Sequence, residues 1–265
     1  MIILAAGDSF IYGNELQSPN NTFTSILGRD YEYKCVAWPG IGNDSIARRT
    51  ISAIEKHLSE ELFVIVCWTF PGRYEFKFTY DTGQLTRDWY AITPWTIKDK
   101  QYVEKEFVSK DEKVLKDHND NFNRAKLSGV YTFASLFYKH VGAGEYWEVY
   151  STLKEIVYLQ NYLKVNNIKY LFTCADNNFL YNATIDGHDD TIQSLYRQIV
   201  EDQESWFWFP AGIKPNETQT PRGFYQWALE NKYPIGTTHP LEQAHIDAAD
   251  LLKEKFNDMV KKHLE

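Results

Sequence analysis

The sequence predicts an α/β fold, with helices on both faces of a parallel sheet in a three-layer α/β/α sandwich. Short apolar runs typical of strands alternate with amphipathic stretches of helical period in the first and last parts of the chain. Such alternation builds a parallel sheet with right-handed crossovers. At 265 residues the chain is long enough to bury a large core, and we expect one domain over residues 1–265.

The predicted strands are residues 2–6, 33–38, 62–68 and 168–174. After the second strand, Ile46, Thr50 and Ile54 recur at helical spacing behind Asn43 or Asp44 as N-cap. Further helices are expected over 146–163, over 191–200 and from Pro240 to Met259. This order of elements is typical of a flavodoxin-like sandwich.

Two aromatic-rich insertions interrupt this scheme, at about 80–140 and 205–231. They lack a clean period and carry Trp89, Trp95, Trp206, Trp208 and Trp227. Segments of this length are often lids or binding insertions, and the aromatic content favours order over disorder. We expect both insertions to cover the ligand-binding edge of the sheet, where tryptophans could stack on sugar rings.

Composition and termini exclude several classes of protein. The net charge of -8 without a basic stripe argues against a nucleic-acid partner. The N-terminus has neither a basic region nor an apolar run long enough for a signal peptide or membrane span, so we expect a cytoplasmic protein without a membrane span. Cys35, Cys67 and Cys174 lack CxxC spacing and are expected to be buried free thiols.

Two short motifs carry chemistry. Gly7-Asp8-Ser9 follows the first predicted strand, and Thr238-His239-Pro240 precedes the last helix. Because ligands of parallel sheets bind at the carboxyl ends of the strands, Ser9 is a candidate nucleophile and His239 its candidate base. The plain alternatives are a turn serine that caps the next segment and a histidine at a helix start.

At these residues the sequence resembles the SGNH (GDSL) hydrolases. Gly7-Asp8-Ser9-Phe10 is similar to their first block, Pro39-Gly40-Ile41-Gly42-Asn43-Asp44-Ser45 to their second, and Thr238-His239-Pro240 to their last. The resemblance covers residues 1–75 and 230–260 and implies ester hydrolysis through a serine acyl-enzyme. A narrower likeness, in Trp68-Thr69, Arg73, Glu75 and Trp227, is to SGNH-like proteins encoded by bacteriophages, and it implies a virion-associated location as an alternative.

The sequence departs from the family pattern at three places. The resemblance implies oxyanion donors at Ser9 and in the turn that ends in Gly42 and Asn43, with Asn43 where the family has glycine. The asparagine of the third block is missing, which leaves Thr69 as a substitute donor. The aspartate three residues before the histidine is replaced by Gly236. Either the pair Ser9–His239 acts alone, or Asp176 after the fourth strand supplies the acid.

No cofactor or metal is expected. The glycines form neither GxxxxGK[ST] nor GxGxxG. The acidic loop at 186–190 has metal-ligand residue types, but acidic residues before a helix are ordinary capping groups. Arg73 and Glu75 are expected to form an ion pair with each other or to contact substrate, and His245 to be a packed or solvated helix residue.

The function predicted from the sequence is a serine esterase of SGNH type that acts on a small-molecule or carbohydrate ester, with a carbohydrate O-acyl ester as the preferred substrate. The alternative is a non-catalytic binding or virion-associated module that retains the fold. A flavodoxin-like protein that binds a nucleotide or flavin is the third choice.

Overall fold

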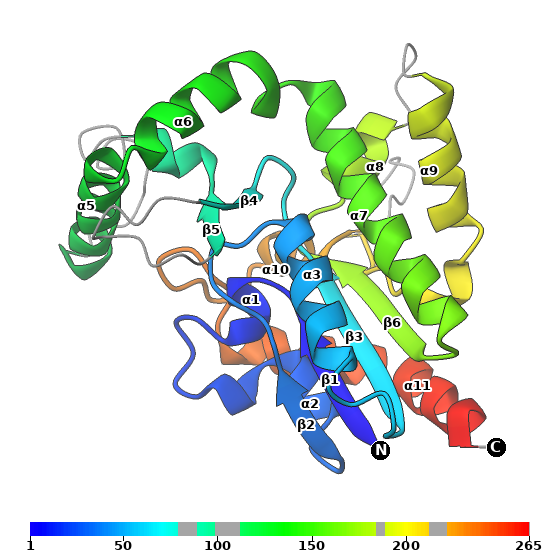
Figure 1. The fold of residues 1–265 in the computed structure, drawn as a ribbon. Helices are drawn as coiled ribbons and strands as arrows, with labels where there is room; N and C mark the ends of the chain where they lie inside the picture. Colours follow the sequence, from blue (N-terminus) through cyan, green and yellow to red (C-terminus); the bar gives the residue numbers. More distant parts are fainter. Residues whose placement is uncertain (79–88, 99–111, 184–188, 212–221, 265) are drawn as a thin grey trace.

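The computed structural model describes residues 1–78, 89–98, 112–183, 189–211 and 222–264, and its centre is a parallel sheet (Figure 1). The strands lie in the order β2–β1–β3–β6. Their bounds are β1 Ile2–Ala6, β2 Glu32–Cys35, β3 Leu62–Trp68 and β6 Lys169–Cys174. The chain runs from β1 to the edge strand β2 and returns to β3 on the other side of β1. The order therefore reverses between β1 and β3, where sheets of this kind bind their ligands.

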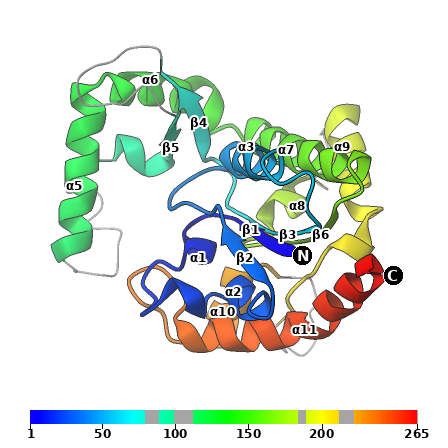
Figure 2. The ribbon, with the colours of Figure 1, turned by 60° about the horizontal axis from the view of Figure 1, so that its bottom comes forward.

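Helices cover both faces of the sheet, as the sequence predicts (Figure 2). Along β1, Ile2, Leu4 and Ala6 belong to one apolar core and Ile3 and Ala5 to the other, because successive side chains of a strand point to opposite faces. The first face packs against α3 (Asn43–Ile54), α7 (Glu145–Val165), α8 (Asn178–Ala183) and α9 (Asp190–Val200). The second packs against α1 (Ser9–Tyr12), α2 (Phe23–Leu27), α10 (Phe224–Glu230) and α11 (Glu242–Leu264), and the short turns η1 (Pro19–Asn21) and η4 (Gln203–Ser205) complete the sandwich. The predicted α/β fold is confirmed.

Several boundaries differ from the prediction by a few residues. The second strand ends at Cys35 instead of residue 38, although the Val36 and Trp38 N–H groups still donate to β1 and to Gly7. All three cysteines are free, and Cys67 and Cys174 are buried. Cys35 is exposed, contrary to expectation, because β2 is an edge strand. No helix in the described ranges is both long and apolar enough to cross a bilayer.

The described part of the first insertion, with the segment just before it, projects from the sandwich beside α3 (Figure 1). It contains the antiparallel strands β4 (Tyr74–Lys77) and β5 (Trp89–Ile92), the turn η2 (Pro94–Ile97), the helices α5 (Glu112–Leu127) and α6 (Val130–Phe137), and the short π-helix η3 (Tyr138–Gly142). Its small core includes Tyr74, Ile92, Ala125, Val130 and Ala134. The sequence shows no clear period here because α6 is apolar around most of its circumference.

The described residues of the second insertion, 205–211 and 222–231, pack into the core. Trp206 is 2% exposed and forms an isolated bridge with Phe172 beside β6, the other edge of the sheet. Trp208 stacks on Trp206. Trp227 packs against Phe209 in the helix layer. The expectation that these three tryptophans line a ligand cleft was wrong, because they close the apolar surface around the edge strand.

Asp44 joins the first insertion to the sandwich. Its carboxylate, at the start of α3, accepts hydrogen bonds from the backbone N–H of Ser45 (2.7 Å) and from that of Glu75 in β4 (2.6 Å). Burial raises the pKa of Asp44 to about 7, although these two bonds oppose the shift.

We predict that the protein loses stability as the pH rises from about 4 to 7 through the Asp44 carboxyl. A folded-state pKa of about 7, above the ordinary value of 3.8, means that the native state binds the extra proton in this window. The stability of the wild type relative to Asp44→Asn, measured by urea unfolding, should therefore fall across the window and level off above it. Asp250→Asn, on the exposed side of α11, is the control. Parallel pH curves for the wild type and Asp44→Asn would contradict the prediction.

Candidate active site

Ser9 lies in a sharp turn between β1 and α1. A Cβ on Gly7 would come within 2.5 Å of the Ile11 side chain, so the turn requires glycine. Asp8 caps the helix, because its Oδ1 accepts a hydrogen bond from the Phe10 N–H at 3.1 Å. Ser9 is the first residue of α1 and is 7% exposed. Its backbone N–H therefore belongs to the first turn of a helix, where N–H groups lack intrahelical partners.

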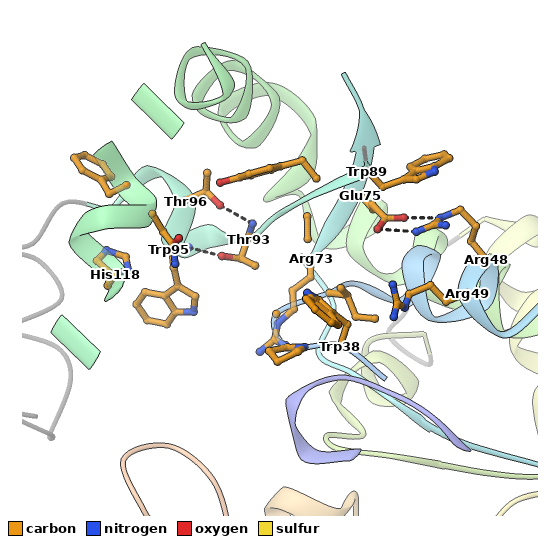
Figure 3. Close-up of a pocket in the computed structure, with 17 residues that line it drawn as sticks. Trp38, Arg48, Arg49, Arg73, Glu75, Trp89, Thr93, Trp95, Thr96 and His118 are labelled. Atoms are coloured by element: carbon orange, nitrogen blue, oxygen red, sulfur yellow. Dashed lines mark hydrogen bonds and ion pairs between the residues drawn. The ribbon is translucent and has the colours of Figure 1, made fainter. Parts of the chain in front are cut away.

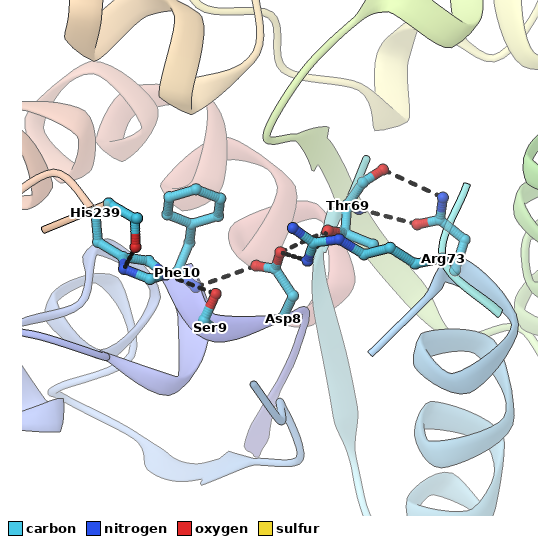
Figure 4. Close-up of polar contacts among 8 residues, drawn as sticks. Asp8, Ser9, Phe10, Thr69, Arg73 and His239 are labelled. Atoms are coloured by element: carbon cyan, nitrogen blue, oxygen red, sulfur yellow. Dashed lines mark hydrogen bonds and ion pairs between the residues drawn. The ribbon is translucent and has the colours of Figure 1, made fainter. Parts of the chain in front are cut away.

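His239 faces Ser9 across this edge of the sheet (Figure 4). The Nε2 atom lies 2.7 Å from the Ser9 hydroxyl, within hydrogen-bond distance. The ring packs edge-on against Phe10, with 5.0 Å between centroids. The proximity that the two motifs predict is present, because the loop before α11 returns to the carboxyl end of β1.

Glu15 lies on the other side of the imidazole. Its Oε1 is 2.7 Å from His239 Nδ1 and accepts a hydrogen bond of 3.0 Å from the Thr238 hydroxyl. The backbone N–H of Thr237 also donates to this carboxylate. Burial raises the pKa of Glu15, but the hydrogen bonds from His239 and Thr238 outweigh it and leave the pKa below its ordinary value. The carboxylate is thus held ionised beside the ring.

The position of Glu15 explains the glycine at 236. A Cβ on Gly236 would collide with Oε2 of Glu15. Glu15 itself has a φ of 67°, a left-handed conformation that is uncommon for residues other than glycine. Its carboxylate therefore occupies space that a side chain at 236 would fill. The sequence analysis missed Glu15, and the only signal for it was the absent side chain at Gly236.

Asp176 does not take the place that the sequence analysis gave it. Its carboxylate accepts a hydrogen bond from the Asn178 N–H at 2.8 Å, at the start of α8. No hydrogen bond joins it to His239 in the part of the chain that the structure describes, and Glu15 holds the Nδ1 side of the ring. Burial raises the pKa of Asp176. The acid that contacts the imidazole is Glu15, which follows α1 in the chain.

Thr69 also has a different place from the one expected. Its hydroxyl donates to Oδ2 of the fully buried Asp8 at 2.5 Å, and Arg73 Nη1 donates to the same carboxylate oxygen at 3.0 Å (Figure 4). The Thr69 proton is therefore engaged, and the geometry does not support a role for this hydroxyl as an oxyanion donor. It ties the end of β3 to the end of β1.

Asn43 acts through its side chain as a clamp. Its Oδ1 accepts from the Thr69 N–H at 2.9 Å, and its Nδ2 donates to the Thr69 carbonyl at 3.2 Å. Gly42, which precedes it, lies against the Arg73 carbonyl so closely that a Cβ would collide with it. Because the Asn43 side chain is engaged with Thr69, the oxyanion donor expected from this turn is a backbone N–H group, that of Gly42 or of Asn43, at the start of α3.

Arg73 and Glu75 do not pair with each other. Glu75 accepts two hydrogen bonds from Arg48, of 2.7 and 3.0 Å, and a third from the Ser45 hydroxyl. Arg73 pairs with Asp8 instead.

A cavity of about 810 Å³ opens between the sandwich and the first insertion (Figure 3). Its walls come from the segment after β2, from α3, and from β5, η2 and α5 of the insertion. The lining includes Trp38, Arg48, Arg49, Arg73, Glu75, Trp89, Trp95 and His118. Trp89 and Trp95 of the first insertion therefore line this cavity, although Ser9 and His239 are not among its lining residues. Arg73 links this cavity to Asp8, the residue before Ser9.

The remaining candidates have structural surroundings. His245 is buried, accepts a hydrogen bond from the Phe23 N–H at 3.2 Å and stacks on the Phe23 ring; burial lowers its pKa to about 3. It is thus a packed core histidine. Asp189 caps α9, while Asp186, Gly187 and His188 lie outside the described residues.

Comparison with known proteins yields only a loose structural likeness. No protein-family model and no curated protein matches the sequence. The solved structure of the psychrotrophic esterase EstA from Pseudoalteromonas sp., inhibited by monoethylphosphonate, aligns with 99% of this chain and 98% of its own. The identity is 13% and the TM-score 0.45, too low to bear on function.

We predict that Asn43→Ala destabilises the protein by about 3 kcal/mol, because it leaves the buried Thr69 N–H and carbonyl unsatisfied. The substitution keeps the backbone N–H of residue 43. Urea unfolding measures the loss, and Asn166→Ala, which removes an exposed amide bonded to the Tyr162 carbonyl, is the control. Equal stability of the two variants would contradict the role of Asn43 as a clamp.

Proposed function

We propose that the protein is a serine hydrolase that cleaves carboxylic esters, with Ser9 as nucleophile, His239 as base and Glu15 as the acid that orients the base. One observation carries the proposal: a continuous chain of contacts of 2.7 Å from the Ser9 hydroxyl to Nε2 and from Nδ1 to Glu15. These are the groups and the contacts that acyl transfer through a serine requires.

The proposed reaction has two halves. The Ser9 hydroxyl oxygen attacks the ester carbonyl while its proton passes to His239 Nε2. The imidazolium that forms is stabilised by Glu15, and collapse of the tetrahedral intermediate expels the alcohol, which takes the proton from Nε2. Water then enters, gives a proton to the same nitrogen and attacks the acyl-serine. The acid leaves, and the proton returns to Ser9.

The oxyanion needs donors that are already in place. The backbone N–H of Ser9 and one from the start of α3, at Gly42 or Asn43, are the proposed pair. Both segments end at the carboxyl edge of the sheet, and the partial positive charge at a helix N-terminus favours an anion there. Asn43 and Thr69 support the arrangement by fixing the end of β3 to α3.

The preferred substrate is an O-acyl ester of a carbohydrate. Trp38, Trp89 and Trp95 each expose more than a third of their surface, and all three line the cavity. Exposed aromatic rings around a polar cavity can stack on sugar faces while the polar groups bind hydroxyls. The alternative function, a non-catalytic binding module, was motivated in part by the missing aspartate before His239. The contact of Glu15 with His239 Nδ1 weakens that argument.

We predict that a fluorophosphonate probe labels the protein once, at Ser9. The contact with His239 makes this hydroxyl more nucleophilic than an ordinary serine. Intact mass should rise by one adduct, peptide mapping should place it on Ser9, and Ser9→Ala should remain unlabelled. A wild type that keeps its mass after prolonged incubation would favour the non-catalytic binding module.

We predict that Glu15→Gln lowers kcat for a 4-nitrophenyl ester by about 10³–10⁴-fold, the size of the loss when a serine protease loses its triad carboxylate. Gly236→Ala should also lower kcat, because the added methyl group displaces the Glu15 carboxylate.

The double variant Glu15→Ala with Gly236→Asp should recover part of the rate that Glu15→Ala loses, since it returns a carboxylate to the same space.

Asp176→Asn is the matched control for these variants, and its kcat should stay within about threefold of the wild type, because the carboxylate caps a helix away from the imidazole. A loss in Asp176→Asn as large as that in Glu15→Gln would reverse the assignment of the acid.

A further inference from the structure

The cavity beside the candidate active site has a charge opposite to that of the whole chain. The protein carries a net charge of -8, yet three arginines and one glutamate line this cavity. Two of the arginines are neutralised in place. Arg48 forms two hydrogen bonds with Glu75, and Arg73 pairs with the buried Asp8 at 3.0 Å.

Arg49 is the cation left over. Its Nε donates to the Val36 carbonyl at 2.8 Å, which fixes the guanidinium at the cavity wall without neutralising it (Figure 3). No carboxylate forms an ion pair with it among the residues that the structure describes. Burial, together with the neighbouring Arg48 charge, lowers the pKa of Arg49. The Glu75 charge opposes this shift, but that carboxylate is already paired with Arg48. A half-buried cation without an ion-pair partner of its own is unfavourable, and a bound anion would relieve this.

Aromatic rings flank this cation. The Arg49 guanidinium lies over the Trp38 ring at 5.5 Å, and that of Arg48 lies over Trp89 at 4.4 Å. Trp38 is 52% exposed and Trp89 45% exposed, so both keep ring surface for a ligand. Fork-shaped donors next to open aromatic faces suit a ring-shaped, hydroxylated ligand that bears a carboxylate or phosphate.

Trp38 connects the cavity wall to the turn that presents Ser9. The Trp38 N–H donates to the Gly7 carbonyl at 3.2 Å, and the Trp38 ring packs on Tyr12 of α1. Gly7 and Ser9 are two residues apart, at most about 7 Å along the chain. A ligand against Trp38 therefore lies beside the segment that carries Ser9.

We propose that this cavity is a subsite for an anionic saccharide, whose carboxylate or phosphate binds Arg49 and whose ring stacks on Trp38 or Trp89. The inference rests on the proposed function for one point only, that the same saccharide carries the ester cleaved at Ser9. A purely apolar acyl chain is a poor fit, because it would strip water from the Arg49 guanidinium without replacing the lost hydrogen bonds.

The test measures binding in the Ser9→Ala protein, so that turnover cannot interfere. The probes are D-glucuronic acid, glucose 6-phosphate and neutral glucose, followed by tryptophan fluorescence and calorimetry at low salt. We expect at least one anionic sugar to bind about 10-fold more tightly than glucose, and the two anions distinguish carboxylate from phosphate recognition. Equal affinity for all three sugars, or no saturable binding of any, overturns the proposal.

The variants locate the effect. In Arg49→Gln the preference for the anionic sugar should disappear, while Arg49→Lys should keep part of it, because lysine retains the charge but not the planar fork. Arg29→Gln, an exposed arginine bonded to the Ile26 carbonyl, is the matched control and should keep the full preference. A full preference in Arg49→Gln overturns the assignment.

The salt dependence of binding and fluorophosphonate labelling are two further tests. If Arg49→Gln fails to fold, as judged by circular dichroism, the preference of the Ser9→Ala protein should still shrink in 1 M salt, because screening weakens an ionic contact; a preference that salt leaves unchanged overturns the proposal. Fluorophosphonate labelling tests the esterase separately. Anion-selective binding without labelling would remove the proposed function and leave the saccharide site, whereas labelling without selectivity would do the reverse.

Discussion

The arrangement of the candidate site depends on one buried anion, the carboxylate of Asp8. A buried carboxylate is costly unless it is paired and hydrogen-bonded, and here three segments provide partners. The Phe10 N–H comes from the start of α1, the Thr69 hydroxyl from the end of β3, and the Arg73 guanidinium from the segment that leads to β4. The same interaction therefore sets the turn that presents Ser9, joins the two central strands at the point where strand order reverses, and places a wall of the cavity.

The acid beside His239 is Glu15, whereas the resemblance implies an aspartate at position 236. The residues at both positions, 15 and 236, are adapted to this change. Gly236 has no side chain, which leaves room for the Glu15 carboxylate. Glu15 in turn adopts a left-handed backbone conformation and accepts hydrogen bonds from the Thr237 and Thr238 backbone. Strained backbone is retained where the surroundings hold it in place, often at functional sites. The histidine thus gains a partner on each nitrogen, although its own loop has no acid at the usual position.

The first insertion and the sandwich contribute different properties to the site. The sandwich holds Ser9 at the start of α1 and His239 in the loop before α11, whereas β5 and η2 of the insertion supply Trp89 and Trp95 to the cavity. Arg48 and Glu75 bridge the two parts, and Asp44 adds a second connection. In the proposed esterase, the chemistry would reside in the sandwich and the selection of substrate in the insertion.

The sequence by itself determined the α/β class, the four strands, most helix positions and the pairing of Ser9 with His239. Strand and helix periods are local, and the two motifs stand at element ends that a parallel sheet must bring to one edge. The sequence did not determine which residues contact Asp8 and His239, or where the tryptophans of the second insertion lie. Thr69, Arg73 and Glu15 reach their places through long-range packing, and Trp206 is buried because it packs on Phe172 of β6. Only the tertiary structure decided these contacts. The side chains that meet at a sheet edge depend on the order of the strands and on the paths of the loops that return to that edge, and local periodicity predicts neither.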